Sequence, residues 1–115
     1  MSLVIYHNPR CSKSRATLAL IREQGLEPEV VEYLKVPLKI EEVKKILDGL
    51  GIEPLELMRK KETLYSELNL SDTSFSREEL IKVILNHPIL MERPIVKNGD
   101  KYVLGRPPEK VLDIL

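Results

Sequence analysis

The residue of this sequence that is best suited to nucleophilic chemistry is its one cysteine. Cys11 is the only thiol among 115 residues, so the chain can form neither an internal disulfide nor a cysteine-based zinc site. It follows the apolar, strand-like run Leu3–Tyr6 and the turn signal His7-Asn8-Pro9. It also opens a segment, from about Cys11 to Gln24, whose apolar residues have helical spacing. A thiol at the start of a helix faces unpaired amide groups and the positive end of the helix dipole, which favour the thiolate.

The charges around Cys11 support the same interpretation. The first 22 residues contain no Asp or Glu, and their four cations are Arg10, Lys13, Arg15 and Arg22. Positive neighbours favour the thiolate, which is the nucleophilic form of cysteine. The alternative is a buried, inert thiol, as many free cysteines are, but Pro9, Ser12 and the flanking cations are not core residues. We therefore predict a reactive thiol at Cys11.

Two polar residues near Cys11 are candidates for activating it. Ser14 completes a C-x-x-S arrangement, and on a first helical turn its hydroxyl could donate a hydrogen bond to the sulfur; the alternative is a bond to backbone alone. His7 could act as a nearby cation or as a hydrogen-bond partner, or it could merely cap the turn. The predicted catalytic set is therefore Cys11, His7 and Ser14.

Three arginines are candidates for binding an anion. Arg59 precedes two lysines, whereas Arg93 and Arg106 each precede a proline, and an X-Pro bond can be cis. Guanidinium groups bind oxyanions through paired hydrogen bonds better than lysine does. Taken singly, each of the three is also consistent with a solvated surface arginine.

The rest of the chain alternates between strand and helix patterns. A second strand is expected at Glu29–Leu34, after Gly25 at the end of the first helix. Helices are expected over 39–51, from Pro54, and from a capping box at Ser76 and Glu79 to His87-Pro88. A hairpin follows, with strands 94–97 and 100–104 joined by a type I′ turn at Asn98-Gly99, and then a last helix.

This order of elements predicts an α/β fold: β-α-β, several helices, then β-β-α. It is compatible with a four-stranded mixed sheet that carries a helical insertion at about 38–90, in a single domain spanning 1–115.

Composition excludes several classes of function. Eighteen Lys plus Arg balance eighteen Asp plus Glu, which argues against a general binder of nucleic acid or of anionic membranes. No apolar run approaches the ~20 residues of a membrane span, and the N-terminal segment does not resemble a signal peptide. We expect a cytoplasmic protein with no metal site.

Several segments resemble the glutaredoxin-coupled arsenate reductases, in that family's order and spacing over nearly the whole chain. The matching segments are His7–Leu18 (HNPRCSKSRATL), Glu56–Lys61 (ELMRKK), Asn86–Val96 (NHPILMERPIV), Gly105-Arg106-Pro107 and Val111–Leu115. A lone C-x-x-S would be unspecific, whereas this series is specific.

The resemblance implies a thioredoxin-like fold and a set of residue roles. Cys11 would attack arsenate at arsenic, and Arg59, Arg93 and Arg106 would bind and polarise the oxyanion. His7 matches the family histidine credited with lowering the thiol pKa. Pro94 matches the proline, usually cis, that faces the active-site cysteine in such folds.

The resemblance also implies an outside source of reducing thiols. Family members use glutathione as a co-substrate to displace the adduct, and glutaredoxin to resolve the mixed disulfide; no tightly bound cofactor is implied. The lone cysteine agrees with this, because one thiol cannot close its own catalytic cycle.

Two other functions remain open at this stage. The same superfamily includes Spx, a regulator that binds RNA polymerase, although that group commonly has C-x-x-C where this chain has C-x-x-S. Lys13 adds a charge in a loop that often has small neutral residues, which leaves open a glutathione-linked thiol reductase acting on another substrate.

Overall fold

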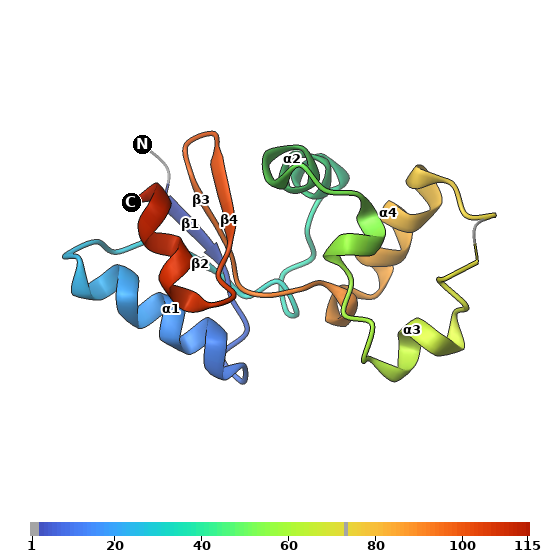
Figure 1. The fold of residues 1–115 in the computed structure, drawn as a ribbon, viewed down its shortest axis with the longest axis horizontal. Helices are drawn as coiled ribbons and strands as arrows, with labels where there is room; N and C mark the ends of the chain where they lie inside the picture. The colour runs from blue at the N-terminus through green and yellow to red at the C-terminus, as the bar shows by residue number, and fades with distance from the viewer. Residues whose placement is uncertain (1–2, 73) are drawn as a thin grey trace. The chain divides into compact units, whose positions relative to one another are not determined.

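The computed structural model describes residues 3–72 and 74–115 (Figure 1). The chain divides into two compact units: the first combines residues 1–36 with 93–115, and the second spans 37–92. The helical insertion expected at about 38–90 lies within the second unit.

The first unit is built on a four-stranded mixed sheet with the order β2-β1-β3-β4. Its strands are β1 (Leu3–Tyr6), β2 (Glu29–Val31), β3 (Ile95–Asn98) and β4 (Lys101–Leu104). β1 runs parallel to β2 and antiparallel to β3, and β3 is antiparallel to β4. The α/β architecture predicted from the order of elements is therefore confirmed.

Helix α1 (Ser12–Glu23) connects the two parallel strands. Gly25 lies just beyond its C-cap residue Gln24, as predicted, with a φ of 78° and an amide that donates to the Arg22 carbonyl at 2.9 Å. The second strand is shorter than predicted, because the chain turns after Val31. The amides of Lys35 and Val36 both donate to the Glu32 carbonyl at 2.9 Å, which closes that turn.

One face of the sheet is covered by α1 and by the C-terminal 3₁₀ helix η3 (Pro108–Ile114), which lie side by side in Figure 1. The hydrophobic cluster between these layers is aliphatic and consists of Ile5, Leu18, Ile21, Val96 and Val111. Burial of these side chains is the main force that holds α1 against the strands.

The β3–β4 hairpin differs from the prediction by one residue. Asn98 pairs with Lys101, so the two-residue loop is Gly99–Asp100 and not Asn98-Gly99. Gly99 has a φ of 64°, whereas Asn98 does not have a positive φ, which fits a turn with glycine at its first central position. Asn98 stays in the strand, where its side-chain amide donates to the Ile114 carbonyl at 2.6 Å and ties η3 to the sheet.

The second unit is helical throughout its named elements. These are α2 (Ile40–Leu50), η1 (Pro54–Leu57), α3 (Thr63–Glu67), α4 (Arg77–Asn86) and η2 (Pro88–Leu90). Its core is aliphatic and includes Val43, Ile46, Leu47, Leu57, Leu80, Ile81 and Ile84. None of the helices within 3–72 and 74–115 is both long and apolar enough to cross a membrane.

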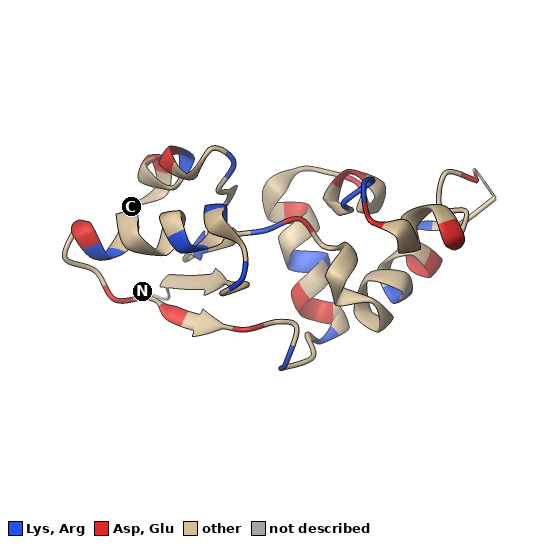
Figure 2. Ribbon diagram, turned by 90° about the horizontal axis from the view of Figure 1, so that it is seen from below, with Lys and Arg blue, Asp and Glu red and all other residues tan. Residues whose placement is uncertain are grey.

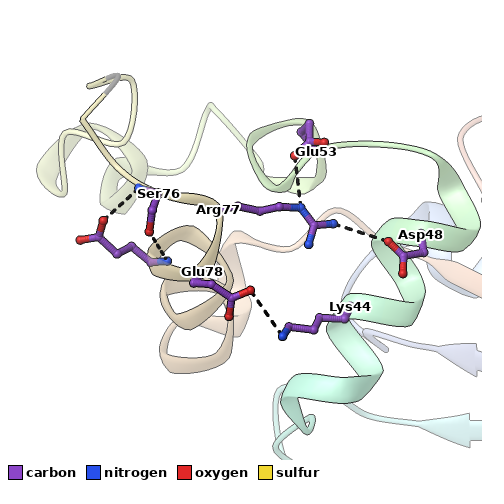
Figure 3. Close-up of polar contacts among 7 residues, drawn as sticks. Lys44, Asp48, Glu53, Ser76, Arg77 and Glu78 are labelled. Carbon is purple, nitrogen blue, oxygen red and sulfur yellow. Dashed lines mark hydrogen bonds and ion pairs between the residues drawn. The ribbon is translucent and has the colours of Figure 1, made fainter.

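The predicted capping box begins α4, and charged residues join that helix to its neighbours (Figure 3). Ser76 Oγ accepts from the Glu79 amide at 3.1 Å, and Glu79 accepts from the Ser76 amide at 2.9 Å. Arg77 pairs with Asp48 at 3.6 Å and with Glu53 at 3.3 Å. These ion pairs are largely exposed, so each adds little to stability; the buried aliphatic residues dominate.

A glycine allows three parts of the first unit to approach closely. A Cβ atom on Gly105 would lie 2.7 Å from Thr17 Oγ1 and 2.8 Å from Pro94 Cγ. The Gly105 amide donates to the Pro94 carbonyl at 2.9 Å, so the backbone cannot shift away without losing that bond. Gly105 is thus the contact point between α1, the start of β3 and the end of β4.

We expect Gly105→Ala to lower the free energy of unfolding by about 1–3 kcal/mol, because the added methyl group overlaps Thr17 and Pro94. Urea denaturation measures this cost. Combining it with Thr17→Ala removes two of the three close contacts, so the double variant should lose less than the sum of the separate losses. A Gly105→Ala protein as stable as the wild type would contradict the close packing.

Candidate thiol and arginine site

The ends of three strands meet at one edge of the sheet in the first unit. Tyr6, the last residue of β1, is paired with Ile95, the first residue of β3. Ile95 is also paired with Leu104, the last residue of β4. The loop that leads to Cys11 therefore leaves the sheet where β3 begins and where β4 ends.

This register also places two distant arginines beyond the same end of the sheet: Arg93 before β3 and Arg106 after β4. The Gly105 amide donates to the Pro94 carbonyl at 2.9 Å, beside the paired residues Ile95 and Leu104, so Arg93 and Arg106 each lie one residue beyond that contact. Both are half-buried. The Arg93–Pro94 and Arg106–Pro107 peptide bonds are cis; Pro94 is the residue for which the family resemblance implies a cis bond.

The loop before Cys11 is held by its own backbone and side chains. The Asn8 side chain accepts from the Arg10 amide at 3.0 Å, and the Asn8 carbonyl accepts from the Cys11 amide at 3.0 Å. Arg15 donates from its guanidinium to the Pro9 carbonyl at 2.8 Å. Asn8 is not among the site residues predicted from the sequence, although an Asn-Pro pair is a signal for such a side-chain-closed turn.

Cys11 is the N-cap residue of α1. Its backbone is extended (φ −93°, ψ 122°), and its carbonyl accepts the first helical hydrogen bond, from the Arg15 amide at 3.0 Å. The sulfur thus takes the place of the Ser or Asp oxygen that usually caps a helix. Among the described residues it accepts no hydrogen bond of full capping geometry, but the amides of the first turn still face it.

These surroundings lower the pKa of the Cys11 thiol. Partial burial is the largest single influence and raises the pKa, since it penalises the charged form. The Ser14 amide, the Arg93 guanidinium and the Lys13 amide together outweigh burial, because each is a donor that favours the thiolate. The thiol is half-exposed, so a reagent can reach it.

Ser14 directs its hydroxyl toward His7. Ser14 Oγ lies 2.6 Å from His7 Nδ1 and accepts from the Asn8 amide at 3.1 Å. All three residues are buried, with Ser14 completely so. It is therefore the amide of Ser14, and not its hydroxyl, that is found to act on the Cys11 thiol.

Burial also determines the charge state of His7. Burial is the largest influence and lowers the pKa of His7 below its ordinary value. The carboxylate of Glu32 raises the pKa but does not offset the effect of burial. The imidazole is consequently neutral at pH 7. Of the two roles considered for His7, the geometry matches a hydrogen-bond partner, which orients Ser14 and the start of α1.

Arg93 retains a donor for a further acceptor. Its Nε is buried and has no hydrogen-bond partner among the residues that the structure describes, although its guanidinium also acts on the Cys11 thiol. Buried donors are rarely left unpaired. An anion bound next to the sulfur would supply the missing acceptor.

Arg59 belongs to the second unit. The segment around it runs antiparallel to residues 90–92: the Arg59 amide donates to the Leu90 carbonyl at 2.6 Å, and the Glu92 amide donates to the Leu57 carbonyl at 2.7 Å. Its guanidinium pairs with Glu62 and, at 3.5 Å, with Glu92. The structure therefore describes Arg59 as a half-buried cation held by two carboxylates.

Within the described part of the chain, no group of three or more His, Cys, Asp or Glu side chains is arranged to hold a metal ion. The chemistry that the site offers is that of an activated thiol beside the guanidinium of Arg93. This combination can bring a nucleophilic sulfur to an oxyanion whose charge is neutralised by arginine.

A mixed four-stranded sheet, with a thiol at the start of the helix after β1 and a cis-proline before β3, defines a protein of thioredoxin-like fold. The ArsC family matches residues 6–114. An arsenate reductase of Haemophilus influenzae is 50% identical over 116 residues, which cover 100% of both chains. The uncharacterised protein YfgD of Escherichia coli K12 is 55% identical over 112 residues, 96% of this chain and 94% of that one.

A solved structure agrees with these sequence relatives. The arsenate reductase from Vibrio cholerae is 51% identical and superimposes with a TM-score of 0.96, covering 100% of this chain and 98% of that chain. The chain belongs to the ArsC family.

We expect the alkylation of Cys11 by iodoacetamide to have its pH midpoint below that of cysteine in a short peptide. Arg93→Gln should move the midpoint to higher pH, because it removes a cation and donor that favour the thiolate. Arg22→Gln is the matched control, since it removes an exposed charge at the other end of α1. An unchanged midpoint in Arg93→Gln would show that Arg93 does not act on the thiol.

Ser14→Ala should lower the free energy of unfolding by about 1–3 kcal/mol, because it leaves the Asn8 amide and His7 Nδ1 buried without their partner. Ser12→Ala is the control: Ser12 is exposed on the same helical turn and should change stability by less than about 0.5 kcal/mol. Equal losses in the two variants, measured by urea denaturation, would refute the role given to the Ser14 hydroxyl.

Proposed function

We propose that the chain is an arsenate reductase in which Cys11 is the nucleophile. The observation that carries the proposal is the Cys11 thiol, with its lowered pKa, next to the Arg93 guanidinium at the start of α1. The names of the relatives from Haemophilus influenzae and Vibrio cholerae support arsenate as the substrate.

The first step is an attack of the Cys11 thiolate on arsenic. A sulfur–arsenic(V) bond forms, and one oxygen of arsenate leaves as water after taking up protons. Arsenate is an anion, so its charge must be offset before a thiolate can approach it. Arg93 and Arg106 offset that charge from the sheet edge, and Arg59 is proposed as the third arginine of the set.

The second step needs an outside thiol, because the chain has no second cysteine. Glutathione is the proposed co-substrate: its thiolate forms a disulfide with Cys11 while the electron pair of the sulfur–arsenic bond passes to arsenic. Two thiols are thereby oxidised to one disulfide, and As(V) is reduced to As(III). Glutaredoxin then removes glutathione from Cys11 by thiol–disulfide exchange.

His7 and Ser14 act in this scheme by positioning. They fix the loop and the first turn of α1, so that the amides of Ser14 and Lys13 stay directed at the sulfur. No tightly bound cofactor is part of the proposal. Its thiol partners belong to the reducing cytoplasm, which is the proposed location of the protein.

A second candidate is a glutathione-linked thiol reductase that acts on another oxyanion or on a disulfide. Lys13 favours it, since this exposed cation stands where the family often has a small neutral residue. Arsenate and the second substrate would use the same Cys11 thiol, so only a comparison of substrates separates the two candidates.

Purified protein supplied with arsenate, glutathione and glutaredoxin should produce arsenite, and Cys11→Ser should abolish that production because a hydroxyl at ordinary pKa is a far weaker nucleophile. Arsenite is measured directly by its separation from arsenate. Ser12→Ala, next to the nucleophile, should retain activity. The proposal fails if the wild-type protein forms no more arsenite than Cys11→Ser.

A further inference from the structure

The start of α1 carries two exposed cations that the chemistry above leaves unused. Arg10 immediately precedes Cys11, Lys13 follows it by two residues, and both side chains are exposed. Their Cα atoms lie within about 4 to 8 Å of that of Cys11 along the backbone. Arg93 and Arg106, in contrast, are half-buried at the sheet edge.

Neither cation is neutralised by the protein. Arg10 and Lys13 form no ion pair with any residue in the described ranges, whereas Arg22 pairs with Glu27, at 3.0 Å. Figure 2 shows Lys and Arg along α1 and an acidic residue only at its last turn, which is Glu23. Glu32, the acid that acts on His7, pairs with Lys35 at 3.5 Å.

The site thus has two separate sets of cations. The half-buried arginines meet the oxyanion next to the sulfur. The exposed pair flanks Cys11 in the sequence, and a second thiol has to reach the same sulfur once the first substrate is in place. Unpaired charges attract an incoming ion of opposite sign and raise its rate of encounter.

We propose that Arg10 and Lys13 select an anionic small thiol, such as glutathione, as the second substrate of Cys11. Glutathione carries a net negative charge through its carboxylates, and two nearby cations would concentrate it at the sulfur. The inference rests on the proposed function for its biological setting, but it concerns the second thiol and not arsenate.

The selection can be measured without arsenate. Cys11 is first converted to its mixed disulfide with 2-thiopyridine, a neutral leaving group. An added thiol then attacks the Cys11 sulfur, forms a new mixed disulfide and releases thiopyridone, which is followed by absorbance. The added thiols are 3-mercaptopropionate, which is anionic, 2-mercaptoethanol, which is neutral, and glutathione. Rates are divided by those for the same disulfide of N-acetylcysteinamide, which corrects for the reactivity of each thiol.

For the wild-type protein at low salt, the normalised rate for the anionic thiol should exceed that for the neutral thiol by about fivefold. Each of the two cations, Arg10 and Lys13, is expected to contribute about two- to threefold. The preference should fall toward one as salt shortens the Debye length to a few ångströms. Arg10→Gln/Lys13→Gln should lose most of the preference and keep only the share that Arg93 and Arg106 contribute, whereas Arg10→Lys/Lys13→Arg, which keeps both exposed charges, should retain it in full.

Arg22→Gln/Lys101→Gln is the matched control. It removes the same charge from exposed residues at the far end of α1 and at the hairpin end of β4, and it should keep the preference. The proposal is overturned if the wild type shows no preference, if Arg10→Gln/Lys13→Gln retains it, or if both glutamine pairs lose it equally. A protein that keeps the preference but reduces no arsenate would refute the proposed function and leave this inference standing.

Discussion

The whole site depends on the position of the Cys11 sulfur at the N-cap of α1. A helix begins with amides that have no partner inside the helix, and an oxygen side chain normally satisfies them. Here a thiol stands in that position, so the amides of Lys13 and Ser14 are available to a thiolate. Partial burial of Cys11 opposes ionisation, but these amides and Arg93 outweigh it. The same burial limits the solvent that would weaken their effect.

Residues around Cys11 hold its sulfur at the start of α1. Asn8 closes the turn before Cys11, while His7 and Ser14 join that turn to the first turn of α1. Thr17, in the next turn of α1, and Pro94 both pack against Gly105, and Pro94 and Gly105 directly adjoin Arg93 and Arg106 in the sequence. The loop before Cys11, helix α1 and the β3–β4 hairpin are therefore in contact with one another around the sulfur. A substitution in one of them is expected to disturb the packing of the other two.

Much of this arrangement follows from local sequence patterns, and the rest depends on contacts between distant residues. The helix after Cys11 with Gly25 beyond its end, the capping box at Ser76, and the order of strands and helices along the chain were all predictable from spacing and residue type. The hairpin turn was not, because Asn98 is held in the strand by its bond to Ile114, sixteen residues away. Likewise, the sequence could suggest Ser14 as a partner of the sulfur, but only the fold brings His7 to its hydroxyl. The placement of Arg93 and Arg106 beyond the same end of the sheet follows from the β3–β4 register, which no local pattern reveals.

The boundary between the two units has a consequence for how the family can vary in length. The second unit returns to the first between Glu92 and Arg93, where one residue is bonded to Leu57 and the next acts on the thiol. An added or deleted residue there would displace Arg93, which acts on the thiol, or Pro94, whose carbonyl accepts from the Gly105 amide. At the other boundary the chain passes through Leu34, Lys35, Val36 and Pro37, which are all exposed. Insertions and deletions between homologues should therefore collect at the entry to the helical unit and be absent from its exit.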